Sequence, residues 1–265
     1  MVNKIITGIT ALSLAAAALV SVPHASAQAN NASIRVVHAS PDAPAVDVYV
    51  DDKRTLSSLS FRRVTGYLSL PAGKHTVKVY PTSAKGTGTP VAQQDVELNG
   101  GWDYTLAATG RASAVQVRVF SDNLNLPGAR KTNLRVYHLS PNAPATNLAV
   151  KGGEVLARNV AYGNATDYLQ LDTKSYQVEV QSATNSQVLA TTTVNLAANS
   201  VQSVFALGLV GETPAFSTVT TIDRRGTGTP ATGAEESFAF MTLVAGMVAA
   251  TGVALKKIAV IQERA

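Results

Sequence analysis

Hydrophobic and polar residues alternate in several short stretches of the chain, with the two-residue period of a half-buried β-strand. The stretch 46–50 reads Val-Asp-Val-Tyr-Val, and similar alternation occurs at 77–79 and 115–119. Between these stretches lie turn-forming segments such as Pro71-Ala-Gly73 and Asn99-Gly-Gly101. Strands separated by turns at intervals of about 8 to 12 residues are typical of sandwiches and barrels. The pattern therefore predicts an all-β protein.

The strand pattern occurs twice, at an offset of 100 residues. Residues 34–45 and 134–145 are identical at eight of twelve positions. A repeat of this length has the size of a domain and exceeds a solenoid unit. We therefore expect two tandem β-sandwich domains of the immunoglobulin or transthyretin type, at 28–120 and 134–216. A loop-rich linker at 121–133 would join them.

The N-terminus carries the pattern of a secretory signal peptide at 1–27. Lys4 precedes an apolar run from Ile5 to Val22, and the small residues Ala25-Ser26-Ala27 follow. This order predicts export by the secretion machinery and cleavage by signal peptidase after Ala27. A buried or membrane helix is the alternative, but the polar residues 28–31 argue against it.

The C-terminus carries a second hydrophobic segment, which predicts an anchor helix at 237–255. Its 19 uncharged residues would span about 28 Å, close to the hydrocarbon thickness of a membrane. Lys256 and Lys257 follow it and would lie on the cytoplasmic side, with the bulk of the chain outside. The predicted location is thus extracellular, on a protein anchored to the cell wall or the membrane.

A stalk at 217–233 would precede this anchor and end in a motif similar to the sorting signal of Gram-positive surface proteins. In that signal a sortase cuts between threonine and glycine and joins the protein to peptidoglycan. Two departures leave a retained membrane anchor as the alternative: Thr229 replaces the usual leucine, and the chain continues after the lysines to Ala265. The motif residues here are Thr229, Pro230, Ala231, Thr232 and Gly233.

Composition excludes several classes of chemistry. The chain has 46% hydrophobic residues, 15% charged residues and no cysteine. It therefore has no thiolate nucleophile, cysteine-ligated metal or disulfide, and each sandwich must be held by its apolar faces. We expect the largest contributions to those faces from the aromatic residues Tyr67, Trp102, Tyr104, Tyr137 and Phe205.

The formal net charge of +5 comes mostly from the first half of the chain. The basic residues there lack the aromatic interleaving of a nucleic-acid platform, so no nucleic-acid partner is predicted. A solvated basic surface is the favoured interpretation, and a weak preference for anionic wall polymer is the alternative.

The segment most alike in the two copies also carries the residues most suited to chemistry. One interpretation makes each histidine a metal ligand or a general base beside the serine, as in a secreted hydrolase. We favour a structural one, in which the imidazole bonds backbone and the serine and Asx side chains cap a rigid turn, because no oxyanion motif follows. The residues are His38, Ser40, Pro41, Asp42 and Pro44, and in the second copy His138, Ser140, Pro141, Asn142 and Pro144.

The string Val36-Val-His-Ala-Ser-Pro-Asp-Ala-Pro44, with Asp47-Val-Tyr-Val50 and Gly66-Tyr-Leu-Ser-Leu-Pro-Ala-Gly73 after it, resembles the DUF4397 family. Secreted bacterial members of that family carry one or several copies of the domain. The resemblance covers 34–120 well and 134–210 in diverged form. It implies a fold and a location, and no established activity comes with it.

Four acidic residues of the first copy lie close together in the sequence: Asp42, Asp47, Asp51 and Asp52. Carboxylates can form a calcium site when several oxygens converge, but Asn147 and Lys151 occupy two of these positions in the second copy. A solvated strand face is the favoured interpretation, with no metal or cofactor. The sequence thus predicts a non-catalytic surface module that either binds an unknown extracellular ligand or serves the envelope structurally.

Overall fold

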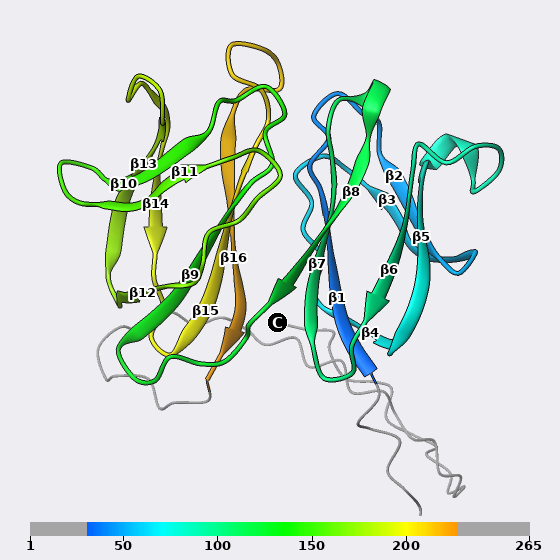
Figure 1. Cartoon of the computed structure of the whole chain (residues 1–265), viewed down its shortest axis with the longest axis horizontal. Coiled ribbons are helices and arrows are strands. Elements are labelled where there is room, and N and C mark those ends of the chain that lie inside the picture. The colour runs from blue at the N-terminus through cyan, green and yellow to red at the C-terminus, as the bar shows by residue number, and fades with distance from the viewer. Residues whose placement is uncertain (1–30, 227–265) are drawn as a thin grey trace, which may run out of the picture. The chain divides into compact units, whose positions relative to one another are not determined.

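The structure is a computed structural model that describes residues 31–226. The first domain contains eight strands, which follow one another through short turns and loops (Figure 1). They are β1 (Asn31–His38), β2 (Val46–Val50), β3 (Lys53–Leu59), β4 (Leu68–Pro71), β5 (Gly73–Pro81), β6 (Ala92–Leu98), β7 (Asp103–Thr109) and β8 (Gln116–Asp122). Two three-residue 3₁₀ helices, Thr82–Ala84 and Ala112–Ala114, lie in its loops.

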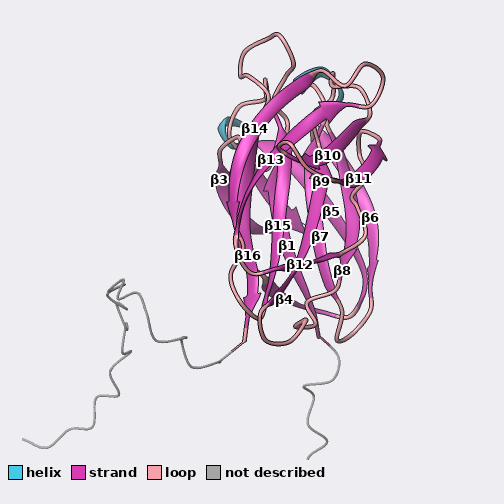
Figure 2. Cartoon of the chain, turned by 90° about the vertical axis from the view of Figure 1, so that its left-hand side faces the viewer, coloured by secondary structure: helices cyan, strands magenta, loops and turns pink. Residues whose placement is uncertain are grey.

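The second domain repeats the same order of strands. Figure 2 shows that strands dominate the described chain. The strands are β9 (Lys131–His138), β10 (Thr146–Val150), β11 (Val155–Val160), β12 (Leu169–Asp172), β13 (Ser175–Ser182), β14 (Val188–Asn195), β15 (Ser200–Leu207) and β16 (Ser217–Arg225).

Each domain is a sandwich of two four-stranded sheets. In the first domain the sheet orders are β4-β1-β7-β8 and β3-β2-β5-β6, and in the second β12-β9-β15-β16 and β11-β10-β13-β14. The pairs β1–β7 and β9–β15 are parallel, whereas the other strand pairs within the described sheets are antiparallel. The prediction of an all-β chain with two tandem sandwiches is confirmed. The predicted signal peptide, sorting motif and anchor helix lie outside the described residues.

The predicted domain boundaries need two corrections. Strand β8 continues to Asp122 and β9 begins at Lys131, so the linker is 123–130 and is shorter than the predicted 121–133. The second sandwich does not end at 216, because β16 pairs along β15 from Ser217 to Arg225. The residues of this segment had suggested a stalk, but threonine and valine also favour a half-exposed edge strand.

Each sandwich encloses its own apolar core, in which the inward residues of the two sheets meet. The first core includes Ile34, Val48, Val79, Tyr104 and Leu106, and the second includes Leu134, Leu148, Val180 and Val204. The expectation for Trp102 is wrong: this side chain lies beside the turn between β6 and β7 and is 53% exposed. Within the described residues, no helix is long and apolar enough to span a membrane.

A third apolar core lies between the two domains. Tyr137 and Phe205 also depart from the expectation, because they lie in this core and outside the sandwich interiors. The inner sheets are therefore covered on both faces, and all eight residues of β15 are buried. The described residues form one compact unit. The buried members of the third core are Val37, Ala39, Ala107 and Phe120 of the first domain and Tyr137, Leu139, Phe205 and Leu207 of the second.

Candidate functional site

The two repeat-signature histidines are buried and bonded to backbone. His38 ends β1 with none of its surface exposed, and its Nε2 lies 3.0 Å from the carbonyl oxygen of Pro44. The Ser40 backbone N–H donates to His38 Nδ1 at 3.4 Å. Because Nδ1 accepts and Nε2 must donate, the imidazole is neutral. Burial lowers the pKa of His38, and the Pro44 carbonyl opposes this only in part.

The serines that follow are bonded away from the histidines. Ser40 Oγ donates to the carbonyl oxygen of Gly110 at 2.8 Å, and Ser140 Oγ donates to that of Gly208 at 2.6 Å. Both serines are fully buried. Each hydroxyl thus ties the loop after the first strand of its domain to the end of the central parallel strand.

The second histidine repeats the Nε2 contact of the first, but its buried Nδ1 has no hydrogen-bond partner among residues 31–226. His138 Nε2 lies 2.9 Å from the carbonyl oxygen of Pro144, and burial lowers its pKa as well, against the opposing effect of that carbonyl. The prolines Pro41, Pro44, Pro141 and Pro144 belong to the segments that turn the chain from the first strand of each domain to the second. Within the described chain, these two segments form neither a histidine–serine hydrogen bond between side chains nor a solvent-facing dyad.

The Asx residue of each signature caps the facing loop. Asp42 Oδ1 accepts from the Ala112 N–H at 2.8 Å, and Asn142 Oδ1 accepts from the Val210 N–H at 2.9 Å. Either residue type supplies the single acceptor oxygen that this position needs. The replacement of aspartate by asparagine in the second copy therefore leaves the contact intact.

The acidic residues near Asp47 serve different partners. Asp47 is buried, and its Oδ1 accepts from the Ser58 N–H and the Thr82 hydroxyl, each at 2.8 Å. Burial alone would raise the pKa of Asp47, but these two hydrogen bonds and Arg54 lower it overall. Asn147 makes the equivalent bond to a backbone N–H of β11, at 2.8 Å. An acceptor oxygen at this position thus stabilises the irregular edge strand in both domains.

Asp51 and Asp52 lie in the turn between β2 and β3, and both contact side chains of β5. Asp52 lies 2.6 Å from Lys78 Nζ, and Asp51 lies 2.6 Å from His75 Nδ1. His75 Nε2 faces the Pro71 carbonyl at 2.9 Å, so both ring nitrogens face acceptors and the charged imidazolium satisfies them. Burial opposes this charge, but the two acceptors raise the pKa of His75 overall. Among the described residues, no group of three or more histidines and carboxylates is placed to hold a metal ion.

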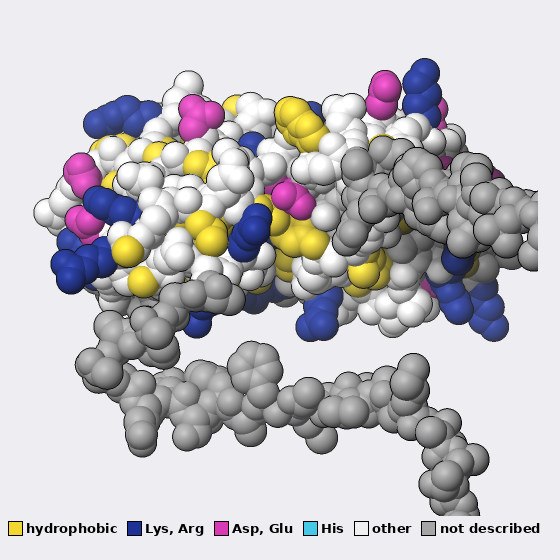
Figure 3. Space-filling view, turned by 90° about the horizontal axis from the view of Figure 1, so that it is seen from below, with side chains coloured by type: hydrophobic (Ala, Val, Ile, Leu, Met, Phe, Trp, Pro, Cys, Tyr) yellow, Lys and Arg dark blue, Asp and Glu magenta, His cyan; other side chains and the backbone are white. Residues whose placement is uncertain are grey.

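Open clefts lie between edge strands of the sandwiches. A cleft of about 590 Å³ lies beside β3 and β4 and is lined by Lys53, Leu68, Leu70 and the Asp51–His75 pair, among other residues. The second domain has a counterpart of about 400 Å³ beside β11 and β12. Figure 3 shows basic side chains in small separate groups with acidic ones among them on the face in view. The clefts could contact a ligand, but that face shows no single basic surface.

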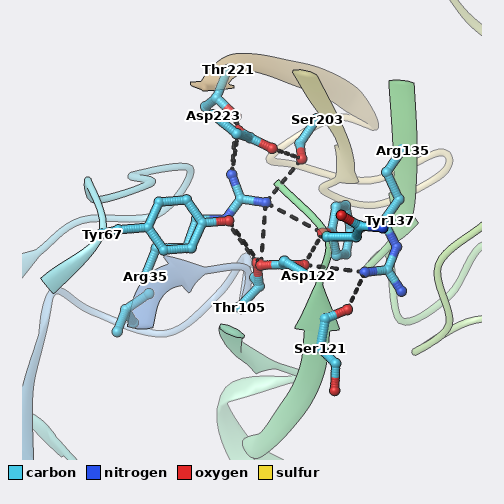
Figure 4. A network of polar contacts seen from close by, with 12 residues as sticks. Arg35, Tyr67, Thr105, Ser121, Asp122, Arg135, Tyr137, Ser203, Thr221 and Asp223 are labelled. Atoms are coloured by element: carbon cyan, nitrogen blue, oxygen red, sulfur yellow. Dashed lines mark hydrogen bonds and ion pairs between the residues drawn. The ribbon is translucent and has the colours of Figure 1, made fainter. Parts of the chain in front are cut away.

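A polar network joins the two domains around Arg35 (Figure 4). Arg35 lies in the middle of β1 and is 1% exposed, and its Nε donates to Thr105 Oγ1 at 2.7 Å within the first domain. Its terminal nitrogens reach the second domain, where one pairs with Asp223. The other donates to Ser203 Oγ at 2.9 Å and to the Tyr137 hydroxyl at 3.3 Å.

A second arginine completes this network from the opposite domain. Arg135 Nη1 lies 3.1 Å from Asp122 Oδ1 and donates to the Ser121 carbonyl at 2.6 Å. Asp122 lies between the two arginines in Figure 4. It also accepts hydrogen bonds from the hydroxyls of Tyr67, Thr105 and Tyr137, at 2.9, 2.5 and 2.6 Å.

The groups of this network keep one protonation state, as a lasting contact between the domains requires. Burial acts to lower the pKa of Arg35, but Asp223 and the neighbouring tyrosines raise it overall, so Arg35 keeps its charge. Burial raises the pKa values of Tyr67 and Tyr137, so both hydroxyls stay protonated and donate. The network pairs two cations with two buried carboxylates, which is the condition for a stable buried charge.

The site residues predicted from the sequence do not include this network, although two signals in the sequence point to it. An arginine occupies the middle of an apolar strand at equivalent positions in the two copies, 35 and 135. Residues 200–207 read Ser-Val-Gln-Ser-Val-Phe-Ala-Leu, with no strict alternation. Strands buried on both faces show this lack of alternation.

A comparison with models of protein families identifies the family of this chain. The model described as "Domain of unknown function (DUF4397)" matches residues 32–149 and 146–235. The chain belongs to the DUF4397 family. The two matches confirm the tandem DUF4397 domains, although the first match extends past the structural boundary into the second sandwich.

Two solved structures show only distant similarity to this DUF4397 chain. The Bacillus anthracis TIE protein is 11% identical over 68% of this chain, with a TM-score of 0.24, and this chain covers 34% of that one. The CBMbc module (family CBM26) of Eubacterium rectale Amy13K, solved with maltoheptaose, is 13% identical over 74% of this chain and 98% of its own, also with a TM-score of 0.24. No curated protein matches the chain.

Proposed function

We propose that this DUF4397 chain is a non-catalytic module displayed at the cell surface, where it binds an extracellular ligand or serves the envelope structurally. The observation that carries the proposal is the use of the repeat-signature residues in the fold. His38 and Ser40 are fully buried and bond backbone carbonyls. A nucleophile and its base need a mutual hydrogen bond and access to substrate, and this pair has neither.

An activity screen tests the absence of catalysis. Purified 28–232 contains all three cores and is expected to hydrolyse no member of a panel of glycan, peptide and ester substrates. The variant His38→Ala separates a true activity from a contaminant. Hydrolysis that disappears in this variant while the fold persists would favour the secreted hydrolase instead.

A binding screen separates the two non-catalytic roles. The fragment 28–232 would be applied to a glycan array and to isolated cell walls, and saturation would be measured. Saturable binding that weakens when Lys53 in the cleft beside β3 is changed to alanine would assign a ligand-binding role to that cleft. Lys151→Ala, in the turn before β11, is the matched control. No saturable binding on either support would favour a purely structural role.

For attachment, we propose export through the signal peptide at 1–27 and covalent linkage to the wall through Thr232. The order of parts supports this: a Pro-x-Thr-Gly motif, an acidic spacer, a membrane-length apolar stretch and two lysines. Intact-mass analysis of protein released by a muralytic enzyme is expected to show a C-terminus at Thr232 bearing wall fragments. If detergent alone extracts protein that still ends at Ala265, the anchor is retained in the membrane.

A further inference from the structure

The contacts between the two sandwiches occur in equivalent pairs. Arg35 of β1 pairs with Asp223 of β16, and Arg135 of β9 pairs with Asp122 of β8. The two arginines differ by 100 in number and the two aspartates by 101. Each domain thus presents one arginine and one aspartate to the other, in equivalent positions.

Two further contacts follow the same exchange. Arg62 Nη2 of the first domain donates to the Thr218 carbonyl of β16 at 3.4 Å. The counterpart of Arg62 is Gly163, since their N–H groups donate to the carbonyls of His38 and His138. The same loop of the second domain faces β8: a Cβ added at Gly163 would lie 3.1 Å from the guanidinium carbon of Arg118, and the ring of the neighbouring Tyr162 lies 6.0 Å from that carbon. When residue i contacts residue j and the equivalent of j contacts the equivalent of i, the interface is isologous, as in a two-fold homodimer. The two domains of one chain are therefore arranged as a pseudo-homodimer.

The pseudo-symmetry is broken at the centre of the third core. Tyr137 of the second domain takes the position of Val37, and Phe205 takes the position of Ala107, as the pairings of β1 with β7 and of β9 with β15 show. The rings of Tyr137 and Phe205 stack with their centroids 4.7 Å apart. At these two positions the second domain contributes the large side chains and the first the small ones. The third buried ring of this core is Phe120 of the first domain, whose centroid lies 5.1 Å from that of Tyr137.

This size difference makes a pair of two first domains, or of two second domains, unfavourable. Two first-domain faces would leave a void where Tyr137 and Phe205 now fit, and a void in a core costs stability. Two second-domain faces would place four large rings, two of Tyr137 and two of Phe205, in a core that now holds three buried rings, and overpacking also costs stability. The mixed pair avoids both penalties.

We propose that the face of β1, β7 and β8 is a docking surface selective for the face of β9, β15 and β16, whether that face belongs to the same chain or to a second copy. The linker at 123–130 holds the two faces in one chain. Once the linker no longer restricts them, first and second domains of different copies pair through the same contacts, whereas like domains do not.

Cleavage of the linker tests this proposal on the folded chain. A site for a specific protease would replace Gly128–Arg130, which are exposed, in the fragment 28–232. The cut protein would be mixed with an isotope-labelled copy and examined by native mass spectrometry. Mixed pairs of one first and one second domain are expected, with labels exchanged between copies. Separation of the halves at micromolar concentration, or pairs of like domains, would overturn the proposal.

Paired variants test the size complementarity. Tyr137→Val with Phe205→Ala is expected to weaken pairing of the halves at least about 25-fold, the effect of losing a central aromatic anchor. Ile222→Ala, at an exposed position of β16, is the matched control and should leave pairing unchanged. Equal weakening by both changes would contradict the proposal.

Moving the two large residues to the first domain gives a more specific test, because it measures whether pairing is restored. Val37→Tyr with Ala107→Phe in the first domain is expected to restore pairing to a second domain that carries Tyr137→Val and Phe205→Ala. A general loss of stability would not be rescued in this way. Circular dichroism of each cut variant would check that the halves remain folded, and folded halves that stay apart would refute the complementarity.

Discussion

Replacing Arg35 with methionine is expected to be among the most damaging single changes in the interface between the domains. The guanidinium bonds Thr105 in its own domain and Ser203 and Asp223 in the other. Methionine keeps an apolar stem of similar length but donates nothing. The carboxylate of Asp223, whose side chain is 0% exposed, is then left buried without a cation.

The size of the effect follows from this burial. Breaking a buried ion pair by removing one partner costs about 3–5 kcal/mol. For a folded unit of this length, that corresponds to a melting temperature lower by roughly 6–20 °C. The equivalent change Arg135→Met should cost only about 1–2 kcal/mol, because this side chain is 15% exposed and Asp122 keeps its hydroxyl donors.

Urea denaturation of 28–232, followed by fluorescence and circular dichroism, measures these differences. The double variant Arg35→Met with Asp223→Asn should be more stable than Arg35→Met alone, because a neutral amide needs no counter-charge. If Arg35→Met costs no more than Arg135→Met, or if the double variant gains nothing, the network is not the electrostatic connection inferred here.

Two further outcomes are expected, one at Gly110, whose carbonyl accepts the hydrogen bond from Ser40, and one at the two signature histidines. Gly110 has φ of +105°, and an added Cβ would lie 2.4 Å from the Ala114 carbonyl oxygen, so Gly110→Ala should cost about 2–5 kcal/mol in a thermal melt. Gly101→Ala, at φ +77° with open space around it, should cost only about 1–2 kcal/mol, and equal losses would contradict the clash. His38 and His138 have folded pKa values below the unfolded value of about 6.5, so the unfolded chain binds more protons and stability should fall as pH drops below 6.5, by at most about 1.4 kcal/mol per pH unit for each histidine. His38→Gln should reduce this slope between pH 6.5 and 5, and an unchanged slope would show that His38 is not the titrating group.

The sequence predicted the class and number of the domains because both depend on local or repeated signals. Alternation at 46–50 and 77–79 reflects one buried and one outer face, and β2 and β5 form there. The near-identity of 34–45 and 134–145 predicted two copies of one fold, and the sheets of the two domains have the same strand order.

The features that the sequence did not predict depend on contacts between segments that are distant along the chain. The parallel pairing of β1 with β7 joins residues 70 positions apart, and no local pattern determines it. Strand β16 is rich in threonine, which suits an exposed stalk and an edge strand equally well. Trp102 was expected inside because of its size, but its place beside a tight turn leaves it exposed.

A comparison of the two copies separates the residues that build each sandwich from those that join the sandwiches. Histidine and serine are the same in both signatures, and in both domains the imidazole Nε2 and the serine hydroxyl bond the equivalent backbone carbonyls. The differences Val37 against Tyr137 and Ala107 against Phe205 lie in the core between the domains. A position that serves only its own sandwich has the same surroundings in both copies, so one residue type suits both. A position in the interface packs against the opposite copy, and a larger residue on one side requires a smaller one on the other. The two domains therefore share one fold but are no longer interchangeable at the faces by which they pack.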